Sequence, residues 1–464
     1  MVRRRQRERS VWEVVLPDAD KLWPDALRRI DHLIDDEALV EVVAEALERR
    51  WPQSRRRGRP GTPAEVVVRM LVLKHLHRWS YAEMEQEVRA NLVYRAFARI
   101  SCDVVPGAKT ILKIARALGP EVSERLHQRV VALAIAAGVT KGRRMRVDTT
   151  VVETNIHYPT DSSLLGDGVR VVTRTLKKLQ ALVGRGPRAV RDRSRRVTRR
   201  LLEILYAARS PKTHAQLVHS YRRLLGTTRA VLRDAATMTR RVGQRRRAVD
   251  AEARRQIGRL QTRLHATVSL VQRVVAQTKA RVLKGDTHVP DKVVSLFEPH
   301  TTPIRKGKLV KPTEFGHLVS IQEAEGQIVT RYAIHDGRPA DSTLWIPALD
   351  AHLHVFGHPP DLAVADRGFA SAANERTAQD RGVRRVVLPR PGKKTVARRA
   401  HERQRWFRRG LRWRVGCEGR ISVLKRRHGV ARCLYHGADG VERWVGLGAI
   451  ASNLLVIAAH VRSG

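Results

Sequence analysis

The chain has 464 residues, of which 42% are hydrophobic, which is enough for a sizeable core and about three domains. Its 90 Lys and Arg residues outnumber 45 Asp and Glu residues, so the formal net charge is +45. This composition excludes a disordered tail, and so strong a positive field favours a polyanionic partner. Nucleic acid is the expected partner, although a membrane surface or ribosomal RNA would also match the charge.

The cysteines and the apolar segments bear on where the protein works. Cys102, Cys417 and Cys433 lie far apart without a CxxC pair, which argues against a disulfide framework or a zinc ribbon and fits a reducing cytoplasm. The basic start leads into no apolar segment, so no secretory signal is expected. The apolar run 447–461 is short for a bilayer span, so we predict a buried helix and no membrane partner.

Residues 1 to about 140 carry the signals of short helices. Thr62 is predicted as an N-cap before Pro63 and three residues before Glu65, and Ser80 and Glu83 repeat this capping-box pattern. The chain from residue 1 to about 140 is therefore expected to be helical.

A later helix in this region has a basic face. It is expected at about 108–118 and carries Lys109, Lys113 and Arg116 on one side. Short helices joined by tight turns, with such a face on a late one, could form a helix-turn-helix that reads a major groove. A plain helical bundle with a solvated basic face explains the same pattern, so both interpretations stay open.

From Met145 the pattern changes to short β-rich segments bounded by Gly, Asp and Pro, with helical stretches toward the C-terminus. This alternation indicates an α/β region. The expected strands lie at 146–152, 317–322, 328–334, 362–365 and 384–388.

An Arg- and Ala-rich region at about 171–283 interrupts the strands, with Leu and Val at helical spacing. Breaks are expected near Ser210 and Pro211 and at Gly243. Helical patterns of this length predict a coiled-coil arm of two or three helices. Its arginines could follow a DNA backbone, or they could simply solvate the exterior of the arm.

Three carboxylates stand out because they lie on or beside apolar strands in a very basic chain. Asp148 lies within the first strand, Asp366 closes the strand 362–365, and Glu418 lies on a basic helix. A buried carboxylate is unfavourable unless it is paired or metal-bound. Taken singly, each has an ordinary explanation as a strand-end acceptor, a turn residue or a surface ion pair. Their order and settings together favour a common site.

The three acids suit a pair of divalent cations. If the strands of Asp148 and Asp366 are neighbours, their carboxylates stand roughly 5 Å apart, and a helix packed on the sheet brings Glu418 to the same place. Two Mg²⁺ or Mn²⁺ ions about 4 Å apart could act there on a phosphodiester. The shortage of Cys and His clusters disfavours zinc. Two rival acids, Asp336 and Asp341, are interpreted as a turn residue and a helix N-cap.

Five segments point to one family: RVDTTVVETNIHYPTDSSLL, KPTEFGHLVSIQ, RYAIHDGRPADSTL, AVADRGFAS and RVGCEGRISVLKRRHG. From about residue 60 to the C-terminus, apart from the arm, the chain resembles the DDE transposases of bacterial insertion sequences. Families of this type share a Tyr, Arg, Glu, Lys signature. Arg414, Glu418 and Lys425 match it in residue and spacing, whereas the tyrosine position holds Leu411.

The resemblance implies that Asp148, Asp366 and Glu418 are the catalytic residues and hold two Mg²⁺ or Mn²⁺ ions. It also implies that Arg414 and Lys425 contact DNA phosphates. A surface salt bridge is the alternative role for Lys425. The full set of expected DNA contacts is Arg414, Lys425, Arg420, Arg367, Lys109, Lys113 and Arg116.

The implied fold is α/β, an RNase H-like mixed sheet flanked by helices, with an all-α N-terminal domain and an inserted helical, coiled-coil arm. Without the arm, the 218 residues from Asp148 to Asp366 shorten to about 100, which ordinary loops can span. We therefore expect a helical DNA-binding domain at 1–140, a catalytic domain at 141–170 and 284–464, and the arm at 171–283.

The implied activity is that of a DNA transposase that binds the inverted-repeat ends of its element, cleaves DNA and transfers the strand to a target. The expected partners are the double-stranded ends and target and further copies of the chain, in a homodimer or larger assembly on the cytoplasmic nucleoid. Two alternatives stay open. One is an RNase H-like nuclease or resolvase without strand transfer, and the other is a DNA-binding protein that has lost catalysis.

Overall fold

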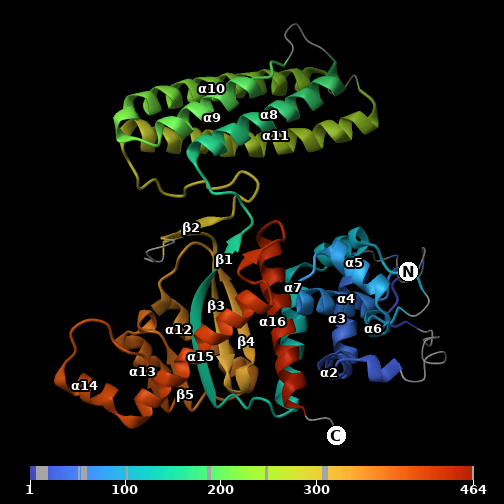
Figure 1. The fold of residues 1–464 in the computed structure, drawn as a ribbon, viewed down its shortest axis with the longest axis vertical. Helices are drawn as coiled ribbons and strands as arrows, with labels where there is room; N and C mark the ends of the chain where they lie inside the picture. Colours follow the sequence, from blue (N-terminus) through green and yellow to red (C-terminus); the bar gives the residue numbers. More distant parts are fainter. Residues whose placement is uncertain are drawn as a thin grey trace. The chain divides into compact units, whose positions relative to one another are not determined.

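A computed structural model of the chain describes residues 1–6, 19–50, 53, 60–100, 103–184, 190–245, 249–305 and 312–461. The chain forms two compact units, of which the first comprises Met1–Asn155 and Gly316–Gly464 and the second Ile156–Phe315 (Figure 1). The second unit is therefore an insertion in the chain of the first. It contains the whole segment predicted as the arm, and the predicted boundary at residue 140 falls inside the first unit.

The first unit begins with a helical region. Its helices are η1 (Ala19–Leu22), α2 (Asp25–Ile34), α3 (Glu37–Arg50), α4 (Ala64–His77), α5 (Tyr81–Ala90), α6 (Leu92–Phe97) and α7 (Ala108–Ala136). The capping box predicted at Ser80 and Glu83 is confirmed at the start of α5. The helix predicted at 108–118 is the first part of α7, which kinks at Gly119, where φ is +74°.

The N-cap predicted at Thr62 is wrong. α4 begins at Ala64 after Pro63 and has no side-chain cap. Glu65, expected to complete a capping box, is buried and forms ion pairs with Arg69 and Arg5 at 3.2 and 3.1 Å. The reason is electrostatic, because Arg69 is fully buried and a buried guanidinium needs carboxylate partners.

A mixed sheet follows the helical region. Its strands are β1 (Arg144–Thr154), β3 (Thr313–Ala324), β4 (Val329–His335), β5 (Leu362–Ala365), β6 (Arg385–Val387) and β7 (Arg432–Cys433). β3 pairs antiparallel with β1 and β4, whereas β5 pairs parallel with β1 and β6. The five predicted strands are confirmed. The short strands β7 and β2 (Thr302–Arg305) were not predicted.

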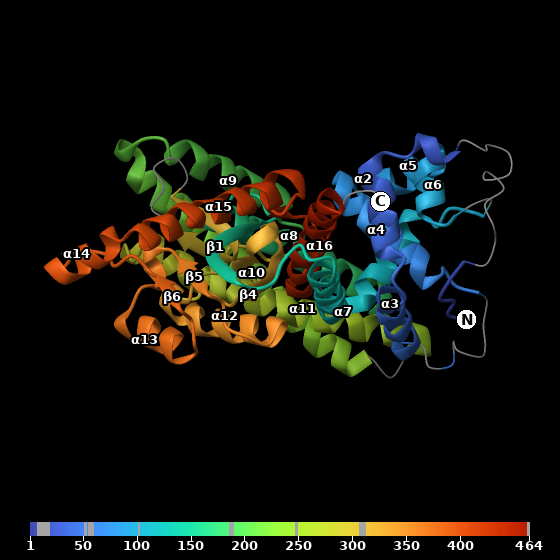
Figure 2. The same cartoon turned by 90° about the horizontal axis from the view of Figure 1, so that it is seen from below.

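Helices cover both faces of the sheet (Figure 2). α12 and α13 pack on the face that includes Val147 and Ala365. α15 packs on the opposite face, where it covers Val364. The elements of this part of the chain are η6 (Glu325–Gln327), α12 (Asp341–Phe356), η7 (Arg367–Phe369), α13 (Ala372–Asp380), α14 (Val396–Arg403), α15 (Arg405–Arg427) and α16 (Ala438–His460).

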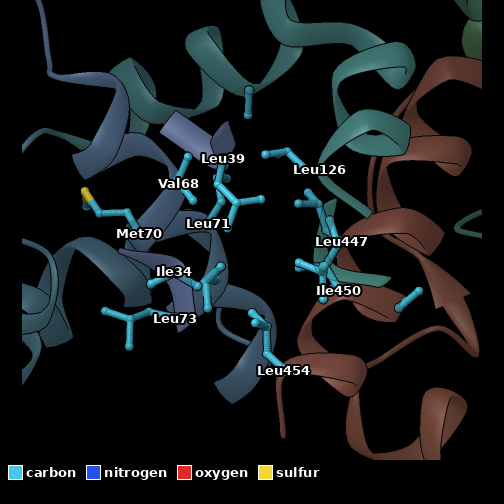
Figure 3. Close-up of a cluster of buried hydrophobic side chains, with 14 of the residues drawn as sticks. Ile34, Leu39, Val68, Met70, Leu71, Leu73, Leu126, Leu447, Ile450 and Leu454 are labelled. Atoms are coloured by element: carbon cyan, nitrogen blue, oxygen red, sulfur yellow. The ribbon is translucent and has the colours of Figure 1, made fainter. Parts of the chain in front are cut away.

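α16 joins the N-terminal helices to the sheet. It packs against α7, α4, α2 and β4. One hydrophobic cluster contains Ile34, Leu71 and Leu126 from the N-terminal helices and Leu447 and Ile450 from α16 (Figure 3). By length and composition α16 could cross a membrane, but 83% of its most apolar window is buried within the protein. The predicted buried helix is therefore confirmed.

The second unit is mostly helical and consists of α8 (Asp161–Val183), α9 (Ser194–Ala207), η3 (Pro211–Thr213), α10 (His214–Arg245), α11 (Ala251–Thr278) and the π-helix η5 (Lys279–Leu283), together with β2. α8 packs against α9, α10 and α11, so the described α-helices form a bundle rather than an arm of two or three helices. The coiled-coil geometry stays a prediction. The break near Ser210 and Pro211 is confirmed. The break expected at Gly243 lies two residues before the end of α10 at Arg245, and the next helix begins at Ala251.

Candidate active site

Asp148 and Asp366 lie side by side in the sheet. They follow directly after Val147 and Ala365, which pair in register between the parallel strands β1 and β5. Side chains alternate between the two faces of a strand. Since Val147 points toward α12, Asp148 points toward α15, and Asp366 lies beside it at the end of β5. The structure therefore brings the first two predicted acids together.

The acids influence one another electrostatically. Burial raises the pKa of Asp148 to about 6, and the negative charges of Asp366 and Glu418 act in the same direction. The Thr149 amide donates a hydrogen bond to Asp148 Oδ1 at 2.7 Å, which partly opposes this rise in pKa. The Gly368 amide donates to Asp366 Oδ1 at 2.5 Å. A group of carboxylates that repel one another is a setting that favours a bound cation.

α15 supplies Glu418 and Arg414, which are four residues apart and so share one face of the helix. Arg414 Nη2 donates to Glu418 Oε1 at 2.9 Å, and Arg414 Nη1 lies 4.0 Å from Asp148 Oδ2. The guanidinium therefore links two of the three predicted acids. The Glu418 side chain is 59% exposed, so it can change rotamer without repacking the core.

The donor set fits a divalent cation, although the acids do not converge on one point in this conformation. Among the residues described, no group of three or more His, Cys, Asp or Glu side chains is arranged to hold a metal ion. Carboxylates are the hard oxygen ligands that Mg²⁺ and Mn²⁺ prefer. The positive charge that Asp148 and Glu418 require is supplied here by Arg414.

A buried ion pair fixes α15 against β1. Arg146 donates to both carboxylate oxygens of Glu323, at 2.6 and 2.8 Å, and both residues are buried. Arg146 also donates to the Trp413 carbonyl, and its guanidinium lies 4.6 Å from the centre of the Trp413 ring. A Cβ at Gly416 would come within 2.2 Å of Arg146 Nη1, so any larger residue there would require the buried guanidinium to move. The network determines where the functional face of α15 points.

The predicted DNA contacts divide into accessible and buried residues. The accessible ones are the exposed Lys109, Lys113, Arg116 and Arg367 and the partly buried Arg414 and Lys425. Arg420 is only 6% exposed. Its guanidinium donates to Ser452 and Gln327 and lies 3.8 Å from Glu323. Because the guanidinium is occupied inside the protein, the predicted DNA contact at Arg420 is withdrawn.

A cavity of about 700 Å³ opens beside Asp366. Its cationic lining residues are Arg367, Arg390, Lys394, Arg412 and Arg414, and Leu411 also lines it. So many cations around one acid suit a phosphodiester backbone. Arg390 and Lys394 belong to a basic run after a strand that, by its sequence, could touch phosphate, and here they pair with Glu375 and Glu402. Arg412 was not a predicted contact.

Asp341 is a residue that sequence reasoning misplaced. The predicted N-cap is wrong, because α12 begins at Asp341 itself and has no side-chain cap. Asp341 Oδ1 instead accepts a hydrogen bond from Thr149 Oγ1 at 3.2 Å, and Oδ2 lies 2.7 Å from where a Cβ at Gly368 would be. Thr149 follows Asp148, and Gly368 lies two residues after Asp366. The Asp341 carboxylate therefore contacts the backbone segments that carry both of these acids. Nothing in the sequence indicates this proximity.

Comparison with known proteins identifies two regions of the chain. A family profile described as "Transposase domain (DUF772)" matches residues 17–117, and one described as "Transposase DDE domain" matches residues 305–454. Asp366 and Glu418 lie within the second match, and Asp148 lies between the two.

One curated protein shares part of the chain. An uncharacterized protein, ORF8 in the nfe locus of Rhizobium meliloti, is 28% identical over 127 residues, which are 26% of this chain and 61% of the relative. The chain thus spans less than two thirds of the curated relative that it matches. No solved structure matches the chain.

Proposed function

Given that the chain belongs to the DDE transposases and carries a second transposase domain on the N-terminal side, we propose that it binds the inverted-repeat ends of its own element, cleaves them and joins them to target DNA. The DDE domain makes the protein a phosphoryl-transfer enzyme that acts on DNA. The observation that carries the proposal of end cleavage and joining is the placement of Asp148 beside Asp366, with Glu418 linked to Asp148 through Arg414.

The sheet supports an RNase H-like catalytic domain. Its strands run in the order β4-β3-β1-β5-β6, with antiparallel pairing from β4 to β1 and parallel pairing from β1 to β6. This arrangement puts Asp148 in the central strand and Asp366 at the end of its parallel neighbour. The proposed domains are a helical DNA-binding domain, this catalytic domain and the helical insertion between its first two strands.

Asp148, Asp366 and Glu418 would hold two Mg²⁺ or Mn²⁺ ions. Bound there, such ions supply an activated attacking oxygen and stabilise the charge on the leaving oxygen. Asp148 and Asp366 are held ready by their local backbone hydrogen bonds. Were Glu418 to serve as a ligand, Arg414 would lose its carboxylate partner and its guanidinium would be available to a DNA phosphate.

The basic residues around the site would position the DNA. Arg367 and Arg414 line the cavity beside Asp366, and Lys425 continues the same helix. Lys109, Lys113 and Arg116 form a separate exposed row on α7, which suits a second stretch of the DNA end. Two ends must be joined in one complex, so we propose a homodimer or larger assembly that acts on DNA in the cytoplasm.

The test compares two aspartates that flank the same strand. With Mg²⁺, duplex ends taken from the DNA beside the gene and a target plasmid, the wild-type protein is expected to cleave the ends and join them. Asp366→Asn should lower both rates by on the order of a hundredfold to a thousandfold, the usual loss when one charge-stabilising group is removed. Asp361→Asn changes an exposed residue at the other end of β5 and should leave both rates unchanged.

The readouts separate the alternatives. Cleavage without joining would favour an RNase H-like nuclease over a transposase. Full activity of Asp366→Asn would remove this aspartate from the site. Binding without Mg²⁺-dependent cleavage by the wild-type protein would favour a DNA-binding protein that has lost catalysis.

A further inference from the structure

The second unit carries more than half of the net charge of the chain in about a third of its length. Residues 156–315 contain 36 Lys and Arg against 11 Asp and Glu, a net charge of +25 out of +45. The unit has its own hydrophobic core between α8, α9, α10 and α11, so most of the burial that holds the helices together is apolar. A surface charged this strongly attracts a polyanion.

One cavity concentrates this charge. It has a volume of about 260 Å³ and lies between α8, α11 and the segment that follows η5. Its floor is formed by Val171, Thr175 and Leu260, and its other lining residues are Arg170, Arg174, Lys178, Arg263 and Phe297. The cationic residues of α8 are spaced four apart, so they form one row along the helix.

Three of these cations are available to a ligand. Arg170 donates to Asp167 at 2.6 Å and is therefore already paired. Arg174, Lys178 and Arg263 are exposed and form no ion pair with a described carboxylate. The Phe297 ring is 51% exposed at the edge of the cavity. A pocket with three unpaired cations and an apolar rim repels cationic ligands and favours an anion that also presents an apolar surface.

We propose that this cavity is a second DNA-binding site, in which Arg174, Lys178 and Arg263 hold consecutive phosphates of a duplex backbone and Phe297 lies against a deoxyribose. The proposal rests on the DNA-binding part of the proposed function. It gives the helical insertion a task of its own, which is to hold a stretch of the same duplex or of the target away from the acids.

The dimensions favour a duplex backbone over other anions. The cavity of about 260 Å³ is just below the pockets of about 300 to 1,000 Å³ that enclose drug-sized ligands, so its row of cations suits a phosphate chain passing over it better than an enclosed cofactor. Residues four apart on a helix are about 6 Å apart along the axis, which is close to the spacing of phosphates along one strand. Single-strand sites present several aromatic rings on which successive bases stack, whereas this lining offers only Phe297.

The test measures how DNA binding depends on salt, with the full-length protein in buffer containing EDTA so that no cleavage occurs. The probe is a labelled duplex of random sequence, and fluorescence anisotropy gives the binding constant over a series of KCl concentrations. Each phosphate contact contributes about 0.9 to the slope of log K against log salt. The triple variant Arg174→Gln, Lys178→Gln, Arg263→Gln should therefore lower the slope by about 2 to 3. Phe297→Ala should weaken binding without changing the slope.

Two control proteins isolate the cavity from the general charge. The first control removes the same charge from exposed positions of α10 outside the cavity by the triple substitution Arg222→Gln, Arg229→Gln, Arg233→Gln. Its salt slope should equal that of the wild type. The second control keeps the charge in the cavity by the triple substitution Arg174→Lys, Lys178→Arg, Arg263→Lys. Its salt slope should also equal that of the wild type. An unchanged slope in the cavity variant, or an equal loss in the α10 variant, would overturn the proposal.

The same salt titration also tests which kind of nucleic acid the cavity binds. A loss of slope with single-stranded RNA but not with duplex DNA would overturn the assignment to a duplex. Because no divalent ion is present, these outcomes are independent of the cleavage test. Wild-type cleavage together with an unchanged slope in the cavity variant would leave the transposase function standing and remove only this site.

Discussion

Asp341 can be tested as a positioning residue for the two strand acids. Asp341→Ala removes the acceptor of the Thr149 hydroxyl and the carboxylate packed against Gly368, so the backbone around Asp148 and Asp366 loses a shared support. We expect cleavage to slow by about tenfold to a hundredfold and the Mg²⁺ concentration for half-maximal rate to rise, as for other residues that orient metal ligands. Initial cleavage rates over a Mg²⁺ titration measure both effects.

The matched control is the other acid of the same loop. Asp336 is exposed, and Asp336→Ala should leave the rate and the Mg²⁺ dependence as in the wild type. A urea titration of each variant checks that the fold is intact. If Asp341→Ala cleaves as fast as the wild type, or if the two variants lose activity equally, Asp341 has no positioning role.

The residues that could be predicted from the sequence are those whose chemistry conflicts with their surroundings. Asp148 and Asp366 stood out as carboxylates on apolar strands, and the register of β1 and β5 brings them together as expected. Arg414 and Arg420 could not be told apart in this way, because both are arginines on one basic helix. Only the packing of α15 shows that Arg420 faces the buried Glu323. The convergence of Glu418 on the metal stays a prediction.

At the scale of elements, the packing of α15 against β1 should be disturbed by adding one methyl group at Gly416. In Gly416→Ala the new Cβ would meet Arg146 Nη1 at 2.2 Å, and the buried pair of Arg146 and Glu323 would have to shift. Disturbing a buried ion pair costs on the order of 3 kcal/mol. We expect a lower urea midpoint and a loss of cleavage, since the same helix carries Arg414 and Glu418.

Gly419 provides the control on the same helix. No atom lies within 4 Å of a Cβ built there, so Gly419→Ala should stabilise the protein by up to about 1 kcal/mol through helix propensity. Its cleavage rate should stay near that of the wild type. Equal effects of the two substitutions would show that α15 does not depend on close packing at Gly416.

Elements with a clear period could be predicted, whereas short or interrupted ones could not. The strand 362–365 has the expected bounds because it is apolar and flanked by aspartates. β7 has two residues and is defined only by its pairing with β1, which no local pattern encodes. The kink in α7 arises at Gly119, which has φ of +74° and precedes Pro120, and a residue before proline is disfavoured in a helical conformation. Gly243 lies two residues before α10 ends.

At the scale of the whole molecule, the least predictable feature is the core that the two ends of the chain share. The N-terminal helices and α16 contribute to one hydrophobic cluster, although more than 300 residues separate them in sequence. The spacing of hydrophobic residues in each helix shows that one side is buried, but it does not show which other element that side packs against. The insertion could be predicted as a helical region, but the bundle around α8 could not, for the same reason.

Buried histidines make the stability of the protein depend on pH. His127 Nε2 donates a hydrogen bond to the Val329 carbonyl at 2.9 Å, and His352 Nε2 donates one to the Gly142 carbonyl at 2.8 Å. Burial lowers the pKa of His127, His352 and His428 to about 4 each. Asp148 acts in the opposite direction, because burial raises its pKa and the folded state gains stability as it is protonated.

Stability is therefore expected to fall as the pH is lowered from 7.5 to 5. Between the ordinary histidine pKa of about 6.5 and the folded value of about 4, the unfolded chain binds protons that the folded protein does not, which costs about 2 kcal/mol per histidine at pH 5. The single group Asp148 offsets only about 1 kcal/mol of this at pH 5. Urea midpoints across this range measure the fall. His127→Gln should show a shallower dependence, whereas the exposed His32→Gln should keep the wild-type one. A midpoint that is the same at pH 5 and pH 7.5 would mean that the three histidines are protonated in the folded protein, and their burial at the junction of helices and sheet would then need charged partners.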